Sequence, residues 1–340
     1  MESRYLVTDA FEAPPQPGYR KSGFIYLDEY GSASLKNRDM EKRILIVGTG
    51  ALGSLFSARL AQAGYAVTML GTWKEGLEAV RLKGVRLIDP TGEQHRFTVQ
   101  ETDDPRECRG VRQALVLVKA WQTGRAARQL AECLAEDGVA VTLQNGLGNR
   151  ETLVQSLGER RVALGVTTTG ATLLEAGRVK AGGEGPISIE QNLALGLLEE
   201  ALMSAGFDLR IVEEAQSLIW GKLVINSAIN PLTALLRVPN GELLERSSAR
   251  EMMSILAGET AQVASAEKIE LPFSDPAAAA EEVARKTASN RSSMLQDVLR
   301  GAPTEIDAIC GAVVEIAHRH GIPTPANLTC WQLVRALHKA

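Results

Sequence analysis

The sequence of 340 residues predicts an α/β protein in which a doubly wound, mainly parallel sheet is followed by an all-helical region. Short apolar runs alternate with helical patterns from residue 43, a glycine-rich turn joins the first run to the first helix, and strand patterns stop near residue 214. Such alternation is typical of a parallel sheet with helices on both faces. We therefore expect a sheet domain followed by a helical domain.

Length and composition limit the class of protein. A chain of 340 residues exceeds the usual size of a single-core domain, so we expect two domains, residues 43–213 and residues 214–340. With 45% hydrophobic and 23% charged residues, the composition is typical of soluble globular proteins. The net charge of −4 and the lack of a long apolar run predict neither nucleic acid nor a membrane as partner.

The N-terminal segment and the cysteines indicate the compartment. Residues 1–42 form an extension with little periodic pattern, which we expect to be partly disordered, and they lack the apolar core of a signal peptide. The four cysteines lie far apart in the sequence, at Cys108, Cys133, Cys310 and Cys330. Free thiols are typical of a reducing compartment, so we expect a cytoplasmic protein. We expect no metal site, because the close pair His318 and His320 would point to different sides of a helix.

The individual elements follow from the spacing of apolar residues. The runs "RILIVG", "ALGSLFSARLAQAG" and "YAVTML" predict a strand, a helix and a second strand over residues 43–70. Next come a hairpin over 85–99 that turns at Pro90 to Gly92, a strand over 114–119, a helix over 124–136 and a strand over 139–145. Residues 162–213 are rich in strand formers and predict an extension of the sheet, with a helix at about 193–205. Helical patterns then cover 215–236, 249–268, 276–288, 303–320 and 324–338.

A glycine-rich turn between the first strand and the first helix predicts a nucleotide site. The turn is "GTGALG", formed by Gly48, Thr49, Gly50, Ala51, Leu52 and Gly53. In a GxGxxG motif the glycines allow a tight turn, close approach of the backbone to a pyrophosphate, and packing of helix on strand. We therefore expect a Rossmann-type domain that binds a dinucleotide. The alternative is a glycine-rich turn with no ligand.

The residues after the second strand bear on the choice of dinucleotide. A site that prefers NAD usually has Asp or Glu there to bind the ribose hydroxyls, but this strand runs into Gly71, Thr72, Trp73 and Lys74. The missing acid and the nearby cation favour NADPH, with Lys74 as the candidate contact for the 2′-phosphate. A loop lysine is more often only solvated, and Glu75 lies beside it.

Two polar residues follow predicted parallel strands. Lys119 stands in "VKAWQ" and Asn145 in "QNGLGN", at the carboxyl ends where open α/β sheets bind ligands. The alternatives are an ordinary surface lysine and a hairpin turn at Asn-Gly. A parallel strand followed by a helix weakens the hairpin reading.

The apolar segment "WGKLVINSAINPL" carries a polar row. Lys222, Asn226 and Asn230 are spaced four apart, so in a helix they lie on nearly one face. Pro231 disfavours the helical conformation at Asn230, so we expect the helix to end or kink there. The row is either a polar catalytic face or the solvent side of an amphipathic helix.

Seven blocks in order resemble ketopantoate reductase, also called 2-dehydropantoate 2-reductase. They are "GTGALG", "VKAWQ", "QNGLGN", "WGKLVINSAINPLTAL", "PNGELL", "RSSMLQD" and "PTEIDAICG", from about residue 43 to near the C-terminus. The resemblance implies a helical domain of the kind found in 6-phosphogluconate dehydrogenase and NADPH-dependent reduction of ketopantoate to pantoate, on the route to pantothenate and coenzyme A. The family often has an arginine after the second strand, where this chain reads "GTWKEG", so cofactor preference is more open than fold.

The resemblance also implies roles for particular residues. Lys222 resembles the catalytic lysine, and we assign Glu305 in "TEID" to catalysis with it. The implied substrate contacts are Asn226, Asn230, Asn240, Ser293 and Asn145, and the implied cofactor contacts add Lys119 and Asn145 to the glycine turn and Lys74. An ammonium suits this chemistry, because it can both stabilise the developing alkoxide, by roughly 3 kcal/mol for a well-placed donor, and protonate it.

Alternatives remain for these residues and for the activity. Ser292 or Ser293 could cap a helix that begins at "MLQDVL", Thr304 could cap a helix next to Glu305, and Asn240 in "PNGE" could belong only to a turn. The alternative activities are reduction of another branched 2-keto acid, a 3-hydroxyacid dehydrogenase with the same Lys222 to Asn226 spacing, and a non-catalytic NADPH-binding regulator. The sequence leaves a homodimer open.

Overall fold

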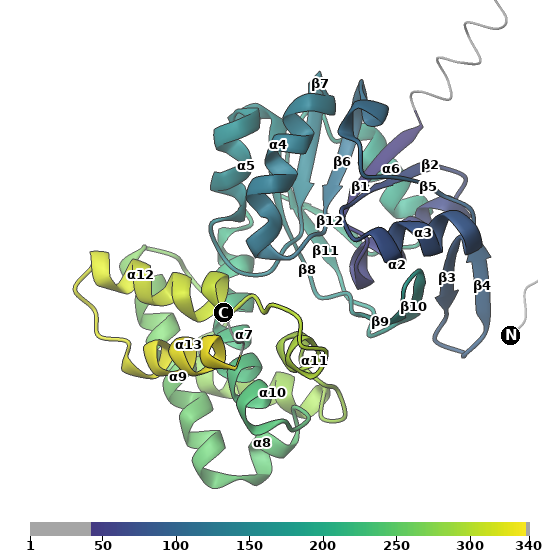
Figure 1. The fold of residues 1–340 in the computed structure, drawn as a ribbon. Helices are drawn as coiled ribbons and strands as arrows, with labels where there is room; N and C mark the ends of the chain where they lie inside the picture. The colour runs from purple at the N-terminus through teal and green to yellow at the C-terminus, as the bar shows by residue number, and fades with distance from the viewer. Residues whose placement is uncertain (1–41, 338–340) are drawn as a thin grey trace, which may run out of the picture. The chain divides into compact units, whose positions relative to one another are not determined.

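The computed structural model describes residues 42–337 (Figure 1). The extension predicted for residues 1–42 lies outside the described residues except for Lys42. None of the described helices combines the length and the apolar character that a membrane span requires.

An eight-stranded sheet has the order β12-β11-β8-β7-β6-β1-β2-β5. Its strands are β1 (Arg43–Val47), β2 (Ala66–Leu70), β5 (Gln100–Thr102), β6 (Val111–Val116), β7 (Leu134–Thr142), β8 (Val162–Thr167), β11 (Ile187–Glu190) and β12 (Leu209–Val212). The neighbouring strands β5, β2, β1, β6, β7 and β8 all pair in parallel. At the other end of the sheet, β8 pairs antiparallel with β11, and β11 pairs parallel with β12. The carboxyl ends of β2, β1, β6, β7 and β8 therefore share one edge of the sheet.

Helices cover both faces of this sheet, which confirms the doubly wound prediction (Figure 1). They are α2 (Ala51–Gln62), α3 (Lys74–Lys83), α4 (Thr123–Cys133), α5 (Asn149–Leu157) and α6 (Gly196–Ser204). Side chains of β1 alternate between the faces: Ile44 and Ile46 pack in one core with α2 and α6, and Leu45 and Val47 in another with α4 and α5. The helix α3 was not among the predicted elements.

A second sheet corrects one prediction. The predicted hairpin is present as β3 (Val85–Ile88) and β4 (Gln94–Phe97), but it joins β9 (Ala171–Glu175) and β10 (Arg178–Ala181) in the order β4-β3-β10-β9. Within 162–213, therefore, β8, β11 and β12 extend the main sheet, whereas β9 and β10 do not. The reason is packing, because Val179 and Val85 bury against the face of α2 that the main sheet leaves uncovered.

From Gln216 onward, the described residues consist of helices and their connecting loops, as predicted. They form α7 (Gln216–Leu236), α8 (Glu242–Glu245), α9 (Ser247–Ala266), α10 (Pro276–Lys286), α11 (Ser293–Leu299), the π-helix η4 (Asp307–Gly311), α12 (Ala312–Arg319) and α13 (Pro325–Ala336). Their core includes Trp220, Leu223 and Val224 of α7. The change from strand to helix falls between Val212 and Gln216, and the domain boundary at residue 214 stays a prediction.

Pro231 does not end its helix, contrary to one of the two expected outcomes. The helix α7 runs through Pro231 and continues to Leu236. Residues around the proline are buried, and the Thr233 hydroxyl donates to the carbonyl oxygens of Ile229 and Asn230, each at 3.0 Å. Tertiary burial therefore outweighs the local preference of the residue before proline.

Candidate active site

A cavity of about 960 Å³ lies at the carboxyl edge of the main sheet. Its lining combines the glycine turn after β1, the loops after β2, β6, β7 and β8, and residues of α7 and α11. The parallel strands bring their ends to this edge, and the helical region closes the other side. The cavity is large enough for a dinucleotide together with a small substrate.

The glycine turn has the geometry that a pyrophosphate needs. Gly48 has φ 128°, which a non-glycine residue rarely adopts. A Cβ at Gly53 would lie 2.1 Å from the carbonyl oxygen of Gly48, so this glycine allows α2 to pack on the turn. A Cβ at Gly50 would meet nothing within 4 Å, which leaves open space at the N-terminus of α2. The turn and the space before it fit a dinucleotide.

The polar row of α7 faces the cavity. Lys222, Asn226 and Asn230 all line it. The Lys222 ammonium donates to the backbone carbonyl of Thr167, at the end of β8, over 2.7 Å. Burial lowers the pKa of Lys222 to about 8, and the Glu305 carboxylate opposes this shift. The ammonium is therefore held at the cavity wall and can release a proton near neutral pH.

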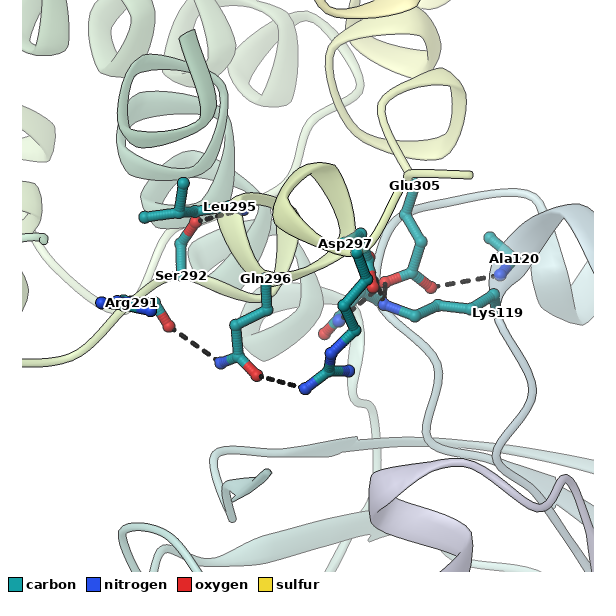
Figure 2. Close-up of polar contacts among 10 residues, drawn as sticks. Lys119, Ala120, Arg291, Ser292, Leu295, Gln296, Asp297 and Glu305 are labelled. Carbon is teal, nitrogen blue, oxygen red and sulfur yellow. Dashed lines mark hydrogen bonds and ion pairs between the residues drawn. The ribbon is translucent and has the colours of Figure 1, made fainter. Parts of the chain in front are cut away.

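A cluster of charges joins the sheet to the helical region (Figure 2). The Lys119 ammonium lies 2.6 Å from Asp297 Oδ2 and 3.4 Å from Glu305 Oε2. Glu305 also accepts hydrogen bonds from the Ala120 backbone N–H at 3.1 Å and from the Asn145 amide at 3.2 Å. The two carboxylates are nearly buried, so the lysine and the amide together satisfy most of their acceptor positions.

The pKa values in this cluster reflect burial and pairing in opposite directions. Burial lowers the pKa of Lys119, but the carboxylates of Glu305 and Asp297 raise it by more, so the net direction is upward. Burial raises the pKa of Asp297 against the attraction of Lys119. Lys119 is therefore a permanent cation at neutral pH, unlike Lys222.

Two contacts fix the margins of the cavity. Next to Asn145, a Cβ at Gly146 would lie 2.3 Å from the Ala308 carbonyl oxygen, and the Leu147 N–H donates to the same oxygen at 3.0 Å. At another margin, the Arg300 guanidinium at the end of α11 donates to the carbonyl oxygen of Leu173 in β9 at 2.8 Å. The first contact is backbone against backbone, and the second depends on one exposed side chain.

Most of the sequence-predicted residues meet in this cavity. Its lining includes Gly48, Thr49, Gly50, Ala51, Leu52, Lys119, Asn145, Lys222, Asn226, Asn230, Ser293 and Glu305. Gly53 does not line the cavity, and instead allows α2 to pack against the turn. The expected capping role belongs to Ser292, whose hydroxyl accepts from the Leu295 N–H at 3.0 Å and contacts Thr233 at 2.7 Å. This leaves Ser293 free to line the cavity. Thr304 caps no helix, because η4 has no side-chain cap.

Two predicted contacts are not brought to the cavity. Lys74 is exposed at the start of α3 and does not line it, whereas Gly71, Thr72 and Trp73 do. Asn240 is buried elsewhere: its amide donates to the Thr287 hydroxyl at 2.8 Å and its backbone N–H to the Asn290 carbonyl at 3.0 Å. Asn240 therefore supports the loop before α11, while its Oδ1 has no hydrogen-bond partner among the described residues, and the substrate contact implied for Asn240 stays a prediction.

Sequence reasoning missed Asp297 and the Thr167 carbonyl. Asp297 stands four residues after Ser293, so helical spacing places both on one face of α11, and this signal was available. The Thr167 carbonyl is a backbone group whose role depends only on tertiary position. Among the described residues, Asp89, Glu93 and His95 come close enough together to ligate a metal, but they lie at the β3–β4 turn and bond to one another and to Thr91.

Comparison with known proteins gives a consistent result. Residues 44–193 match the family model "Ketopantoate reductase PanE/ApbA", and residues 214–338 match its C-terminal counterpart. A 2-dehydropantoate 2-reductase of Archaeoglobus fulgidus is 38% identical over 87% of this chain and 98% of its own length. One from Halobacterium salinarum is 35% identical over 86% of this chain and 98% of its own length.

Solved structures share the fold. A PanE/ApbA family ketopantoate reductase from Ralstonia eutropha JMP134 aligns with a TM-score of 0.81 and 30% identity, over 87% of this chain and 98% of that one. D-mandelate dehydrogenase in a ternary structure with NADH and anilino(oxo)acetate aligns equally well, with a TM-score of 0.81 and 26% identity over 87% and 98% of the two chains. With both family models matched and relatives above 30% identity over nearly their full length, the chain belongs to the ketopantoate reductase family.

Proposed function

We propose that this protein reduces 2-dehydropantoate to pantoate with NADPH as the hydride donor. The observation that carries the proposal is the Lys222 ammonium, held by the Thr167 carbonyl in the cavity that also contains the glycine turn. A proton donor with a pKa near 8 beside a dinucleotide site suits reduction of a ketone. A binding protein without catalysis has no need of such a group, which argues against the regulator alternative.

Each residue of the cavity has a separate role in the proposed reduction. When bound, the reduced nicotinamide supplies a hydride to the C2 carbonyl carbon of the keto acid. Lys222 donates a hydrogen bond to the carbonyl oxygen, stabilises its negative charge as the C–H bond forms, and transfers the proton that completes the alcohol. Glu305 raises the pKa of Lys222 and so keeps it protonated. Asn226, Asn230 and Ser293 orient the substrate from α7 and α11.

The lining supports a substrate that carries a hydroxyl group. The same lining that contains Lys222 presents hydroxyls and amides, including Thr168, Thr169, Asn226, Asn230 and Ser293. A site built to hydrogen-bond a substrate hydroxyl strongly rejects analogues without one, because its polar groups are left unpaired. This favours ketopantoate over other branched 2-keto acids and over the aromatic acid that the name of D-mandelate dehydrogenase implies for that relative.

The cofactor is a nicotinamide dinucleotide, and NADPH is our proposal for this chain. Its support is the absence of Asp or Glu from Gly71, Thr72 and Trp73, the residues that line the cavity after β2. Lys74 lies outside the lining, so it does not strengthen the case. The NADH in the D-mandelate dehydrogenase structures makes NADH the alternative.

One kinetic comparison tests substrate and cofactor together. Purified protein is assayed with ketopantoate and a panel of other 2-keto acids, each with NADPH and with NADH. We expect the highest kcat/KM for ketopantoate with NADPH, by a wide margin. Equal values for a keto acid without a hydroxyl group would overturn the substrate assignment, and equal values with NADH would overturn the cofactor assignment.

Compartment and assembly complete the proposal. Four free, buried cysteines suit a reducing compartment, and we propose the cytoplasm. A homodimer stays a prediction, which the sedimentation coefficient of the purified protein checks.

A further inference from the structure

We infer that the indole of Trp73, supported by Gly76, forms the stacking surface for the adenine ring of the bound dinucleotide. The inference rests on the proposed function, because it assigns one end of the same cavity.

Trp73 is the one aromatic side chain among the described residues that line the cavity. It follows β2 and precedes α3, with 37% of its surface exposed. A large aromatic side chain exposed at a cavity wall offers a flat apolar surface without a protein partner. A planar base is the ligand group that such a surface suits, because aromatic faces stack on any nucleobase.

The position of Trp73 in the sheet identifies which end of the dinucleotide it meets. Lys222 is anchored to the end of β8, and β8 and β2 are separated in the sheet by β7, β6 and β1. Four strand spacings of about 4.8 Å place the two strand ends about 19 Å apart. The hydride must arrive beside Lys222, and the glycine turn after β1 takes the pyrophosphate between them. The group that reaches Trp73 is therefore the adenosine.

Gly76 holds the ring in this place. It lies in the first turn of α3, and a Cβ there would come within 2.3 Å of Trp73 Cε3 and 2.8 Å of Cδ2. The indole thus lies directly against the helix backbone at a position where only glycine leaves room. Because Gly76 has no positive φ, alanine would fit the helix itself and would act mainly by displacing the ring.

The test measures binding rather than turnover. Isothermal titration calorimetry gives the Kd of NADPH and of 2′,5′-ADP, which lacks the nicotinamide, for the wild type and for Trp73→Ala, Trp73→Phe and Gly76→Ala. We expect Trp73→Ala to weaken both ligands about tenfold, and Trp73→Phe to retain most of the affinity. Gly76→Ala should weaken both ligands while leaving the Tm unchanged or higher. Gly258→Ala, where a Cβ in α9 would meet nothing within 4 Å, is the matched control and should change neither Kd.

Fluorescence adds a readout that a purely structural role would not give. Addition of 2′,5′-ADP should quench part of the tryptophan emission of the wild type, and the quenching should disappear in Trp73→Phe, which keeps the other three tryptophans and still binds. An unchanged Kd in Trp73→Ala, or undiminished quenching in Trp73→Phe, would overturn the inference. Failure of the proposed function is distinguishable, because it would appear in the kinetic comparison of keto acids and cofactors, whereas this test measures only the binding of the adenosine end by Trp73.

Discussion

At the scale of single residues, the two lysines of the cavity have opposite electrostatic surroundings. The Lys119 ammonium contacts two carboxylates. The Lys222 ammonium donates to a backbone carbonyl and interacts with the Glu305 carboxylate electrostatically, at longer range. Burial therefore dominates at Lys222 and lowers its pKa to about 8, while pairing dominates at Lys119. Of the two, only Lys222 can change its protonation near neutral pH, which supports its proposed role as the proton donor.

The first prediction concerns Lys222→Met, which removes the ammonium and keeps most of the side-chain volume. We expect kcat for ketopantoate to fall by about a hundredfold to a thousandfold, the usual loss when a single transition-state donor is removed. The Kd of NADPH should stay within about twofold, since Lys222 lies at the substrate end. Lys180→Met, at an exposed position of β10, is the control and should keep full activity. Undiminished turnover in Lys222→Met would exclude the assigned role.

The second prediction concerns pH. Since the active form of Lys222 is the ammonium, kcat/KM for reduction should be constant below pH 8 and fall above it. Glu305 raises the pKa of Lys222, so in Glu305→Gln the fall of kcat/KM at alkaline pH (the alkaline limb) should begin at lower pH. This shift is separate from any decrease in the maximal kcat/KM. Because burial lowers this pKa from the 10.5 of an unfolded lysine, the unfolded state binds more protons between pH 8 and 10.5, and this group makes stability rise with pH there.

The control for the pH profile is Glu281→Gln, on the surface of α10 away from the cavity lining. Its alkaline limb should coincide with that of the wild type. A limb in Glu305→Gln that stays in place, or moves to higher pH, would show that Glu305 does not act on Lys222 as proposed.

At the scale of elements, sequence periodicity was sufficient where local signals and tertiary packing agree. The β1–α2–β2 unit and the helices α7, α9, α10 and α13 match the predicted ranges closely, because apolar spacing sets both their conformation and their buried face. Sequence periodicity failed where packing against a distant element determines which sheet a strand joins. The strands β9 and β10 look like any other strands in sequence, and only the uncovered face of α2 draws them into a second sheet.

The third prediction compares the second and third glycines of the turn, Gly50 and Gly53. Gly53→Ala should lower the Tm and abolish NADPH binding, because its Cβ would lie 2.1 Å from a backbone oxygen that cannot easily move. Gly50→Ala should cost no more than about 1 kcal/mol of stability, as a change at a helix N-cap. Gly50→Ala should nevertheless raise the Kd of NADPH more than tenfold, because the methyl group enters the space for the pyrophosphate. Thermal melts with calorimetry check both, and equal effects of the two variants on Tm and Kd would contradict the geometry.

At the scale of the whole described chain, the site forms only when the sheet and the helical region meet. Local sequence context made Lys222, Asn145 and Lys119 candidates, and the family resemblance added Glu305. The contacts of Glu305 with Asn145 and Lys119 bridge 160 and 186 residues along the chain, and no local pattern encodes such a pairing. For the same reason the contacts of Asn240 with Thr287 and Asn290 could not be predicted from the "PNGE" turn.

The fourth prediction tests the charge cluster as a link between the two regions. Lys119→Met leaves Asp297 and Glu305 nearly buried without their cation, so we expect the free energy of unfolding to fall by about 2 kcal/mol. Urea denaturation at pH 7 measures it, with Lys180→Met as the control that should change stability little. Since the pKa of Lys119 is raised, the contribution is present below 10.5 as long as the carboxylate of Asp297 is ionised, and a loss that vanishes near neutral pH would argue against this pairing.

The backbone contact between Gly146 and Ala308 has a mechanical consequence. With no side chain in between and a hydrogen bond from Leu147 beside it, this margin cannot separate without breaking main-chain contacts. The margin between Arg300 and Leu173 is held by one solvent-exposed guanidinium, and beside it the Lys119–Asp297 ion pair joins α11 to the sheet, so this side can separate once these two side-chain contacts part. Ligand exchange should therefore proceed as a rotation about Gly146, in which Asn145 and Glu305 keep their hydrogen bond while the cavity opens on the α11 side.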